Sequence, residues 1–415
     1  MYPGMKNTRL IPIAITVALL MSGCSKKSSV TGPSTTANSA TIYLDNRQQV
    51  IRGFGAANIV GWRPDMTLAQ IQTAFGTGDG QVGFTLMRLR IPPDSTQFSI
   101  DIPSAKAAEA LGATVIATPW TPPSWMKTND NLAGGYLDTN QYAAYAAHLK
   151  AFADTMANEG APVYAISVQN EPDANVSYES CFWNGTQFLN FMKYYAPSVG
   201  IPVFMPESEN FNHALSDPTL NDAVAASHVA FIGGHVYGAG PSTYSLAFSE
   251  GKEVWMTEHY TDTDSGNVWP LALNVAKEIN DCMNANMSAY VWWYIVRFYG
   301  PIDEEGIPTK RGYLMSQYAK FVRPGFYRVS ATANPQPNIY ITAYKNGAKV
   351  VVVALNMGSS PVSQAFSIPN VTARAFTPYV TSTTENCVEG NNLSVSSGDF
   401  TATLDSLSVT TFVSN

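Results

Sequence analysis

The stretch NQYAAYAAHLKAFADTMANEGAPVYAISVQNEP, residues 140–172, holds one repeat of the fold. Apolar residues in its first part recur every three or four positions, which predicts a helix over 140–159 with one buried face: Tyr142, Tyr145, Leu149, Phe152 and Met156. Gly160 can end that helix, and residues 163–171 then form an apolar, β-branched run that closes on a carboxylate. A helix followed by a buried strand predicts a unit of a parallel sheet.

The same alternation extends over most of the chain. Strand-like runs occupy residues 50–57, 85–91, 114–120, 163–171, 201–207, 228–237, 253–259 and 288–295. Helical periodicity fills the segments between and after them at 103–111, 140–159, 186–198, 220–227, 271–287 and 311–321. Eight strand-like runs that alternate with helical segments predict a (β/α)₈ barrel, an α/β fold, over residues 49–326.

The last part of the chain has a different pattern. From residue 327 to 415 it shows short alternating strands and turn residues, with a hairpin signal centred on Asn346-Gly347. We therefore predict a side β-sandwich domain over 327–415, which the strand-like residues 41–48 would join.

The N-terminus has the pattern of a processing segment. Lys6 and Arg9 precede an apolar run that ends at Cys24, so residues 1–24 resemble a bacterial lipoprotein signal. Ordinary signal cleavage nearby is the alternative. Residues 25–40 are rich in Ser and Thr and predict a linker. The chain is thus expected to be exported, either secreted or anchored at the cell envelope, with membrane contact only through a lipid on Cys24.

Composition excludes several other classes of protein. Hydrophobic residues make up 45% and charged residues 13%, which is enough apolar sequence for a large core. The net charge is −7 and no basic stripe is visible, so a nucleic-acid partner is not expected.

A monomer is expected. After Cys24 three cysteines remain, Cys181, Cys282 and Cys387, either as a disulfide pair with one thiol or as three free thiols.

Two glutamates follow buried runs at opposed positions of the predicted barrel. Glu171 ends the fourth strand-like run, and Glu258 is the second-last residue of the seventh. Catalytic groups of such barrels project from the carboxyl ends of strands, and paired carboxylates are the machinery of glycoside hydrolysis. The alternative is that each forms a buried ion pair with Arg88 or Arg90.

Five segments of the barrel region carry a family resemblance. They are RGFG at 52–55, ATPWTPPSWMK at 117–127, VQNEP at 168–172, WMTEHY at 255–260 and WYIVRFYG at 293–300. With them the chain resembles glycoside hydrolase family 30, and within it the bacterial glucuronoxylanase subfamily. The resemblance implies an endo-acting retaining enzyme that cleaves β-1,4-xylosidic bonds of glucuronoxylan, without a metal or organic cofactor.

Residue roles also come from this resemblance. Glu171 would be the general acid/base and Glu258 the nucleophile, while Asn170 would bind the sugar hydroxyl next to the reacting carbon and Tyr237 would donate to Glu258. Three tryptophans are candidates to line the cleft, one of them expected to be core: Trp120, Trp125 and Trp293. Lys127 is expected to be a solvated loop charge.

The segment after the eighth strand bears on substrate specificity. The subfamily binds a glucuronic acid branch with an Arg and two Tyr, which correspond here to Arg297, Tyr294 and Tyr299. The family pattern YIRRSY reads YIVRFY in this chain, so an Arg and a Ser are replaced, and Thr263 stands where the family usually has Ser. Two alternatives stay open: a hydrolase indifferent to glucuronate, acting on xylan or a β-glucan, and a non-catalytic glycan-binding lipoprotein.

Overall fold

The computed structural model describes residues 38–238, 240–261 and 264–415. The predicted signal, Cys24 and Thr263 lie outside these residues. Within the described part of the chain, no helix combines the length and apolar character needed to cross a membrane.

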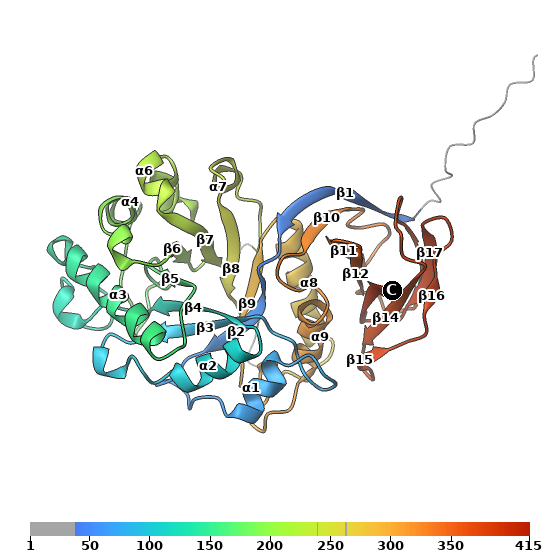
Figure 1. The fold of residues 1–415 in the computed structure, drawn as a ribbon, viewed down its shortest axis with the longest axis horizontal. Helices are drawn as coiled ribbons and strands as arrows, with labels where there is room; N and C mark the ends of the chain where they lie inside the picture. Colours follow the sequence, from blue (N-terminus) through green and yellow to red (C-terminus); the bar gives the residue numbers. More distant parts are fainter. Residues whose placement is uncertain (1–37, 239, 262–263) are drawn as a thin grey trace, which may run out of the picture. The chain divides into compact units, whose positions relative to one another are not determined.

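A closed barrel of eight parallel strands forms the larger part of the fold (Figure 1). The strands are β2 (Gly53–Asn58), β3 (Leu86–Ile91), β4 (Thr114–Pro119), β5 (Ala165–Ser167), β6 (Val203–Ser208), β7 (Val229–His235), β8 (Glu253–Glu258) and β9 (Ala289–Tyr294). The helices are α1 (Leu68–Phe75), α2 (Ile102–Ala110), α3 (Tyr142–Asn158), α4 (Gly185–Tyr194), α5 (Asp217–Leu220), α6 (Ala223–Ser227), α7 (Ser245–Ser249), α8 (Leu271–Asn284) and α9 (Lys310–Ala319). At least one helix follows every strand, which confirms the predicted (β/α)₈ architecture.

Several predicted elements differ in extent. The fourth strand is much shorter than 163–171, because only Ala165–Ser167 pairs and the chain then turns so that Glu171 has a φ of 39°. The helix expected over 220–227 is two short helices, since the Asp222 side chain accepts from two backbone amides and starts a new one. Helices α1 and α7 were not predicted; both are short, and Thr67 starts α1 with a capping box.

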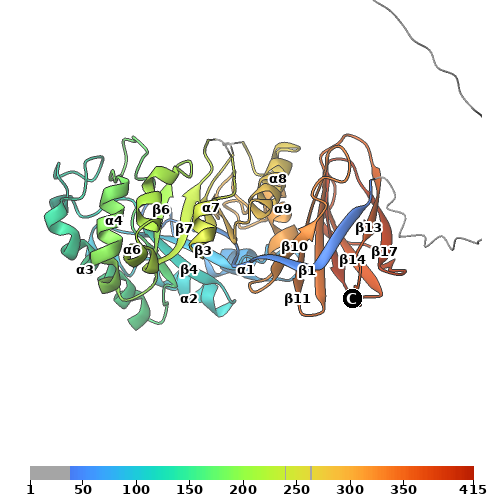
Figure 2. The same cartoon turned by 90° about the horizontal axis from the view of Figure 1, so that it is seen from above.

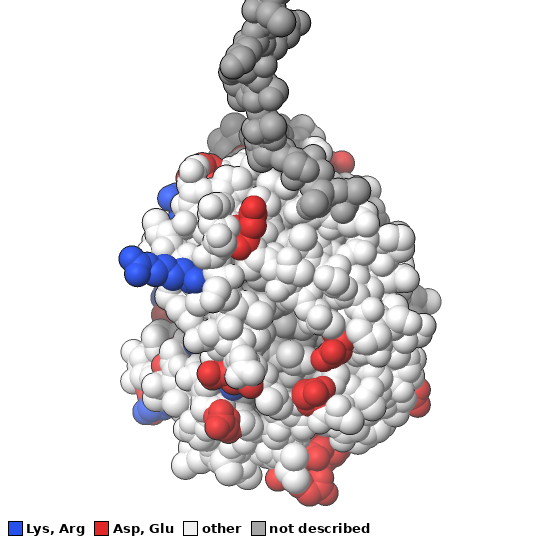
Figure 3. All heavy atoms as spheres, turned by 90° about the vertical axis from the view of Figure 1, so that its right-hand side faces the viewer, with Lys and Arg blue, Asp and Glu red and all other residues white. Residues whose placement is uncertain are grey.

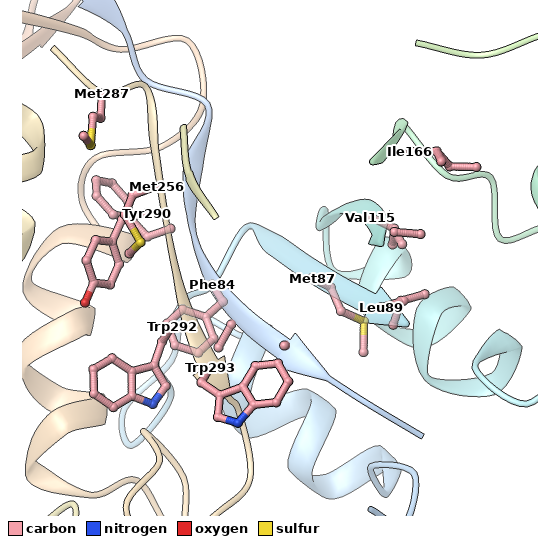
Figure 4. Close-up of a cluster of buried hydrophobic side chains, with 14 of the residues drawn as sticks. Phe84, Met87, Leu89, Val115, Ile166, Met256, Met287, Tyr290, Trp292 and Trp293 are labelled. Carbon is pink, nitrogen blue, oxygen red and sulfur yellow. The ribbon is translucent and has the colours of Figure 1, made fainter. Parts of the chain in front are cut away.

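Three stacked aromatic rings belong to the cluster of buried side chains formed by the barrel strands. Phe231 lies between Phe204 and Trp255, with ring centroids 4.4 and 3.9 Å apart, and all three are buried. A larger apolar cluster surrounds the barrel, and Figure 4 shows part of it, including Met87, Tyr290 and Trp292. Close packing of this kind fixes the strand ends, on which the site depends.

The side domain is a mixed sheet that folds over on itself (Figure 2). Its strands are β1 (Ala40–Val50), β10 (Tyr327–Ala331), β11 (Ile339–Asn346), β12 (Lys349–Asn356), β13 (Val362–Ser367), β14 (Ala375–Thr381), β15 (Asn386–Glu389), β16 (Leu393–Ser394), β17 (Asp399–Leu404) and β18 (Ser408–Ser414). The rings of Phe366 on β13 and Phe412 on β18 meet at 5.2 Å although these strands are not neighbours in the sheet, so two layers enclose one core.

Two details of this domain follow from its register. β1 pairs with β10 and β13, so the strand before the barrel belongs to the sheet after it. In the β11–β12 hairpin Asn346 pairs with Lys349, which places the turn at Gly347-Ala348, one residue later than expected. The reason is Gly347, whose φ of 56° supplies the left-handed conformation that the turn requires.

Helix α9 joins the two domains. The Gln317 side chain donates to Thr381 Oγ1 at 2.7 Å, and the Gln317 backbone carbonyl accepts from Thr411 Oγ1 at 2.8 Å.

The face of the side domain seen in Figure 3 carries few charged side chains, mostly acidic. Cys181 and Cys282 are buried and Cys387 is half-buried, and all three are free thiols, the second of the two alternatives.

Candidate active site

A cleft of about 590 Å³ opens at the carboxyl ends of the barrel strands. It is lined by Trp62, Trp120, Glu171, Tyr178, Glu209, Tyr237, Glu258, Tyr260, Trp293 and Tyr294. Six of these were candidates from the sequence. Trp62, Tyr178, Glu209 and Tyr260 were not, although each lies in a segment that follows a strand.

Glu258 is held at the end of β8 by two donors. Arg88 Nη1 lies 2.6 Å from its Oε2, and the Tyr237 hydroxyl donates to its Oε1 at 2.8 Å. Burial raises the pKa of Glu258, and the charges of His235 and Arg88 counteract this. The arginine ion pair that was the alternative to a catalytic role is therefore present for Glu258, which nevertheless lines the cleft.

Arg88 organises the floor of the cleft from β3. It is fully buried, and besides Glu258 it donates through Nη2 to Asn170 Oδ1 at 2.7 Å and through Nε to Thr118 Oγ1 at 3.2 Å. Its Nη2 also lies 3.2 Å from Glu207 Oε1. One planar guanidinium thus positions residues from four strands or strand ends.

Glu171 lies opposite Glu258 and is bound by His235. The imidazole Nδ1 is 2.9 Å from Glu171 Oε1. A carboxylate oxygen of Glu171, a ring nitrogen of His235 and a carboxylate oxygen of Glu258 all lie within 4.8 Å of one another. Burial lowers the pKa of His235, but the Glu258 charge, the hydrogen bond that His235 donates to Glu171 and the nearby Glu207 carboxylate outweigh it and raise the pKa to about 9. His235 is therefore a cation that donates to Glu171 at neutral pH.

Glu207 is a buried acid that sequence analysis missed. It is the penultimate residue of β6 and has a φ of 52°, and it is completely buried beside Arg88 and His235. Burial raises its pKa, yet Arg88 and His235 lower it to about 2, so it is an anion that compensates the two cations. Its position at the end of a predicted strand, where Glu171 and Glu258 also stand, was the signal that could have found it.

The cluster of Glu171, His235 and Glu258 does not suit a metal ion, although the spacing of these side chains would allow one. Its only imidazole carries a proton near neutral pH, and the Glu258 carboxylate already faces a guanidinium. A cation there would meet two positive groups.

Aromatic rings form the wall of the cleft. The Trp62 ring meets those of Trp120 at 5.3 Å, Tyr178 at 6.0 Å and Trp293 at 6.5 Å. Behind this wall Arg90 lies 5.6 Å from the Trp62 ring and donates from Nε to Glu179 Oε2 at 2.8 Å. Arg90 thereby ties the Trp62 segment to the segment of Tyr178.

Arg297 and Tyr299 do not figure among the described residues that line the cleft. Arg297 Nη1 lies 3.6 Å from Glu304 Oε1, and its guanidinium is 5.7 Å from the Tyr299 ring. Tyr299 in turn stacks on Tyr260, a cleft residue, at 5.5 Å. Tyr299 thus contacts the lining of the cleft through Tyr260.

The expectations about the three tryptophans and about Lys127 were wrong. None of the three candidate tryptophans is pure core, because Trp120 and Trp293 line the cleft while Trp125 is 60% exposed outside it. Lys127 is buried rather than solvated. Its Nζ donates to Thr121 Oγ1 at 2.9 Å and to the Ser180 carbonyl at 2.6 Å, since this loop folds back over it.

Known glycoside hydrolases resemble this protein in sequence and in fold over nearly the whole chain. The family description "Glycosyl hydrolase family 30 TIM-barrel domain" matches residues 72–192. Glucuronoxylanase XynC of Bacillus subtilis (strain 168) is 41% identical, covering 98% of this chain and 100% of that protein. The glycoside hydrolase family 30 subfamily 8 xylanase Xyn30A from Clostridium acetobutylicum has a TM-score of 0.86 at 42% identity, covering 91% and 100%. A family 30 endoxylanase from Clostridium papyrosolvens C71 has a TM-score of 0.83 at 38% identity, with the same coverage.

Proposed function

The chain belongs to glycosyl hydrolase family 30, and on that premise we propose that it is an endo-acting β-1,4-xylanase that cleaves glucuronoxylan with retention at the anomeric carbon. The proposal assigns Glu171 as the general acid/base and Glu258 as the nucleophile. The cleft is open and lined by aromatic rings, which suits binding along a polysaccharide chain.

The spacing of the two carboxyl groups carries the proposal. Oxygens of Glu171 and Glu258 lie within 4.8 Å of each other. Retaining glycosidases hold their carboxyls about 5–5.5 Å apart, whereas inverting enzymes need about 6.5–9.5 Å to admit a water molecule. The short separation supports direct attack by one carboxylate and disfavours a purely binding role.

The hydrogen bonds support the division of roles. The two carboxyls interact strongly, so a proton added to the site belongs to the pair. Glu258 accepts from the Arg88 cation and from Tyr237, which stabilise it as the anion needed for attack. The proposal requires that proton on Glu171, and Oε2 is the oxygen that would carry it, because Oε1 accepts from His235. Glu171 then donates the proton to the departing glycosidic oxygen as Glu258 bonds to the anomeric carbon.

The second half of the reaction uses the same groups in reverse. Glu171, now a carboxylate, removes a proton from water, and the resulting nucleophile breaks the bond between sugar and Glu258. Asn170 accepts from Arg88 through Oδ1, so its amide Nδ2 is the group that can donate to the neighbouring sugar hydroxyl. A hydrogen bond there stabilises the transition state more than the ground state.

Recognition of the glucuronate branch is the finer part of the proposal. Arg297 has the planar fork that matches a carboxylate, and its side chain is 29% exposed. A branch carboxylate would have to draw it from Glu304, which holds it at a loose 3.6 Å. That same ion pair favours a second candidate function, a glucuronate-independent endo-xylanase in which Arg297 is structural.

The test uses residues 25–415 on glucuronoxylan and on unbranched xylan, with products weighed by mass spectrometry. Cleavage of only the branched polymer, with one glucuronate in every product, supports branch reading by Arg297. Equal cleavage of both supports the second candidate, and cleavage of neither refutes the substrate assignment. Glu258→Gln should abolish turnover without unfolding the chain, and a wild-type rate in that variant refutes the nucleophile assignment.

We also propose export of the protein with a lipid on Cys24, and a monomeric state. The lipoprotein-like signal supports the first. A Cys24→Ala variant should leave the membrane fraction of the producing cells. Light scattering on residues 25–415 measures the mass in solution, and a dimer would refute the second.

A further inference from the structure

A second hollow of about 390 Å³ lies on the carboxyl-end side of the barrel. Residues 93–95, which follow β3, and residues 123–126, which follow β4, line it together with Leu132 and His148. It shares no lining residue with the catalytic cleft. Trp120 lines the cleft and Trp125 lines the hollow, so one short segment contributes an indole to each.

The Trp125 side chain is exposed to solvent, and a hydrogen-bonded turn holds its backbone in place. Its side chain is 60% exposed, whereas the next residue, Met126, is buried. The Met126 amide donates to the Pro123 carbonyl at 2.9 Å, and the Lys127 amide donates to the Ser124 carbonyl at 3.0 Å. The buried Lys127 ammonium anchors the turn from below. An indole held open to solvent by a rigid turn is preorganised for a ligand.

The polar groups around Trp125 indicate the class of ligand. Asp94, Ser95 and Ser124 offer hydroxyl and carboxylate oxygens, and no Lys or Arg lines the hollow in the described part of the chain. Burial lowers the pKa of His148, which keeps that ring neutral. An aromatic face beside hydrogen-bonding oxygens suits a neutral pyranose ring, while Asp94 would repel an acidic sugar.

We propose that this hollow is a second saccharide site, which binds a neutral pyranose unit of the xylan backbone outside the catalytic cleft. The choice of xylan as the polymer rests on the proposed function. The choice of a neutral pyranose ring rests on the side chains that line the hollow. A polymer held at two places on one protein has a higher effective concentration at each. Trp125 thereby strengthens binding to polymer and takes no part in bond cleavage.

Native affinity electrophoresis tests the site. The parent protein is Glu258→Gln over residues 25–415, in gels containing glucuronoxylan, unbranched xylan, β-glucan or no polysaccharide. Adding Trp125→Ala should weaken retardation severalfold in both xylans, and Trp125→Phe should be intermediate. Tyr194→Ala, which removes another aromatic side chain that is 65% exposed, should match the parent. Melting temperatures check that all variants are folded.

Outcomes separate this site from the proposed function. Retardation of Trp125→Ala equal to the parent in every gel overturns the site, even when the wild-type enzyme cleaves xylan. If the wild-type enzyme cleaves neither xylan, the proposed function fails. A Trp125-dependent retardation in β-glucan alone would then keep the neutral-pyranose site and refute xylan as its ligand.

Discussion

Arg88→Lys is the substitution that most directly probes how the cleft is built. The guanidinium donates to Glu258, Asn170 and Thr118 through three different nitrogens, at 2.6, 2.7 and 3.2 Å. Lysine keeps the charge that compensates the buried carboxylates, but it offers one compact ammonium in place of a planar fork. We therefore expect a folded protein in which at least one of the contacts to Glu258 and Asn170 is lost.

The size of the effect follows from these contacts. A hydrogen bond to a charged group is worth about 1.5–3 kcal/mol, so losing one that acts in the transition state lowers kcat/KM by about 10- to 150-fold. Arg88→Met removes the charge as well and leaves His235 as the remaining cation named beside Glu258 and Glu207. Breaking a buried ion pair in that way destabilises a fold by about 3–5 kcal/mol.

The assay compares kcat and KM on glucuronoxylan with chemical unfolding of the same samples. The loss should fall mainly on kcat, because Glu258 and Asn170 are proposed to contact the reacting sugar. A folded Arg88→Lys protein with kcat/KM within about twofold of wild type, a difference below 0.5 kcal/mol, would refute the organising role. Equal stability of the Lys and Met variants would refute the charge compensation.

Three further predictions concern positions around the cleft. His235 has a folded pKa of about 9 against an ordinary 6.5, so its stabilisation is complete below pH 6.5 and is lost as pH rises through 9. His235→Gln should remove on the order of 3 kcal/mol of this pH dependence in unfolding measurements, and an unchanged pH slope contradicts it. Glu179→Gln should raise KM for xylan more than it lowers kcat, because Arg90 then no longer ties Tyr178 to the cleft wall; wild-type kinetics would contradict this. Lys127→Met should destabilise the fold by about 2–3 kcal/mol in thermal unfolding, whereas a solvated charge would change it by less than about 0.5 kcal/mol.

Local patterns explain what was predictable. The barrel could be predicted because each strand and long helix shows its own period, as α3 does with an apolar residue every three or four positions. Glu171 and Glu258 could be singled out because each ends an apolar run, and parallel strands bring their carboxyl ends to one face. These features need only neighbouring residues, together with the rule that strands of a barrel run in one direction.

Contacts between distant parts of the chain decided the rest. The Arg88–Glu258 pair joins residues 170 positions apart, and nothing in either segment specifies the partner. The burial of Lys127 depends on the carbonyl of Ser180, 53 positions further along the chain. Sequence alone determined the barrel and the two carboxylates at its strand ends. Tertiary structure decided which charges compensate them and which aromatic rings face the cleft, because burial and charge pairing depend on all the elements that pack around a side chain.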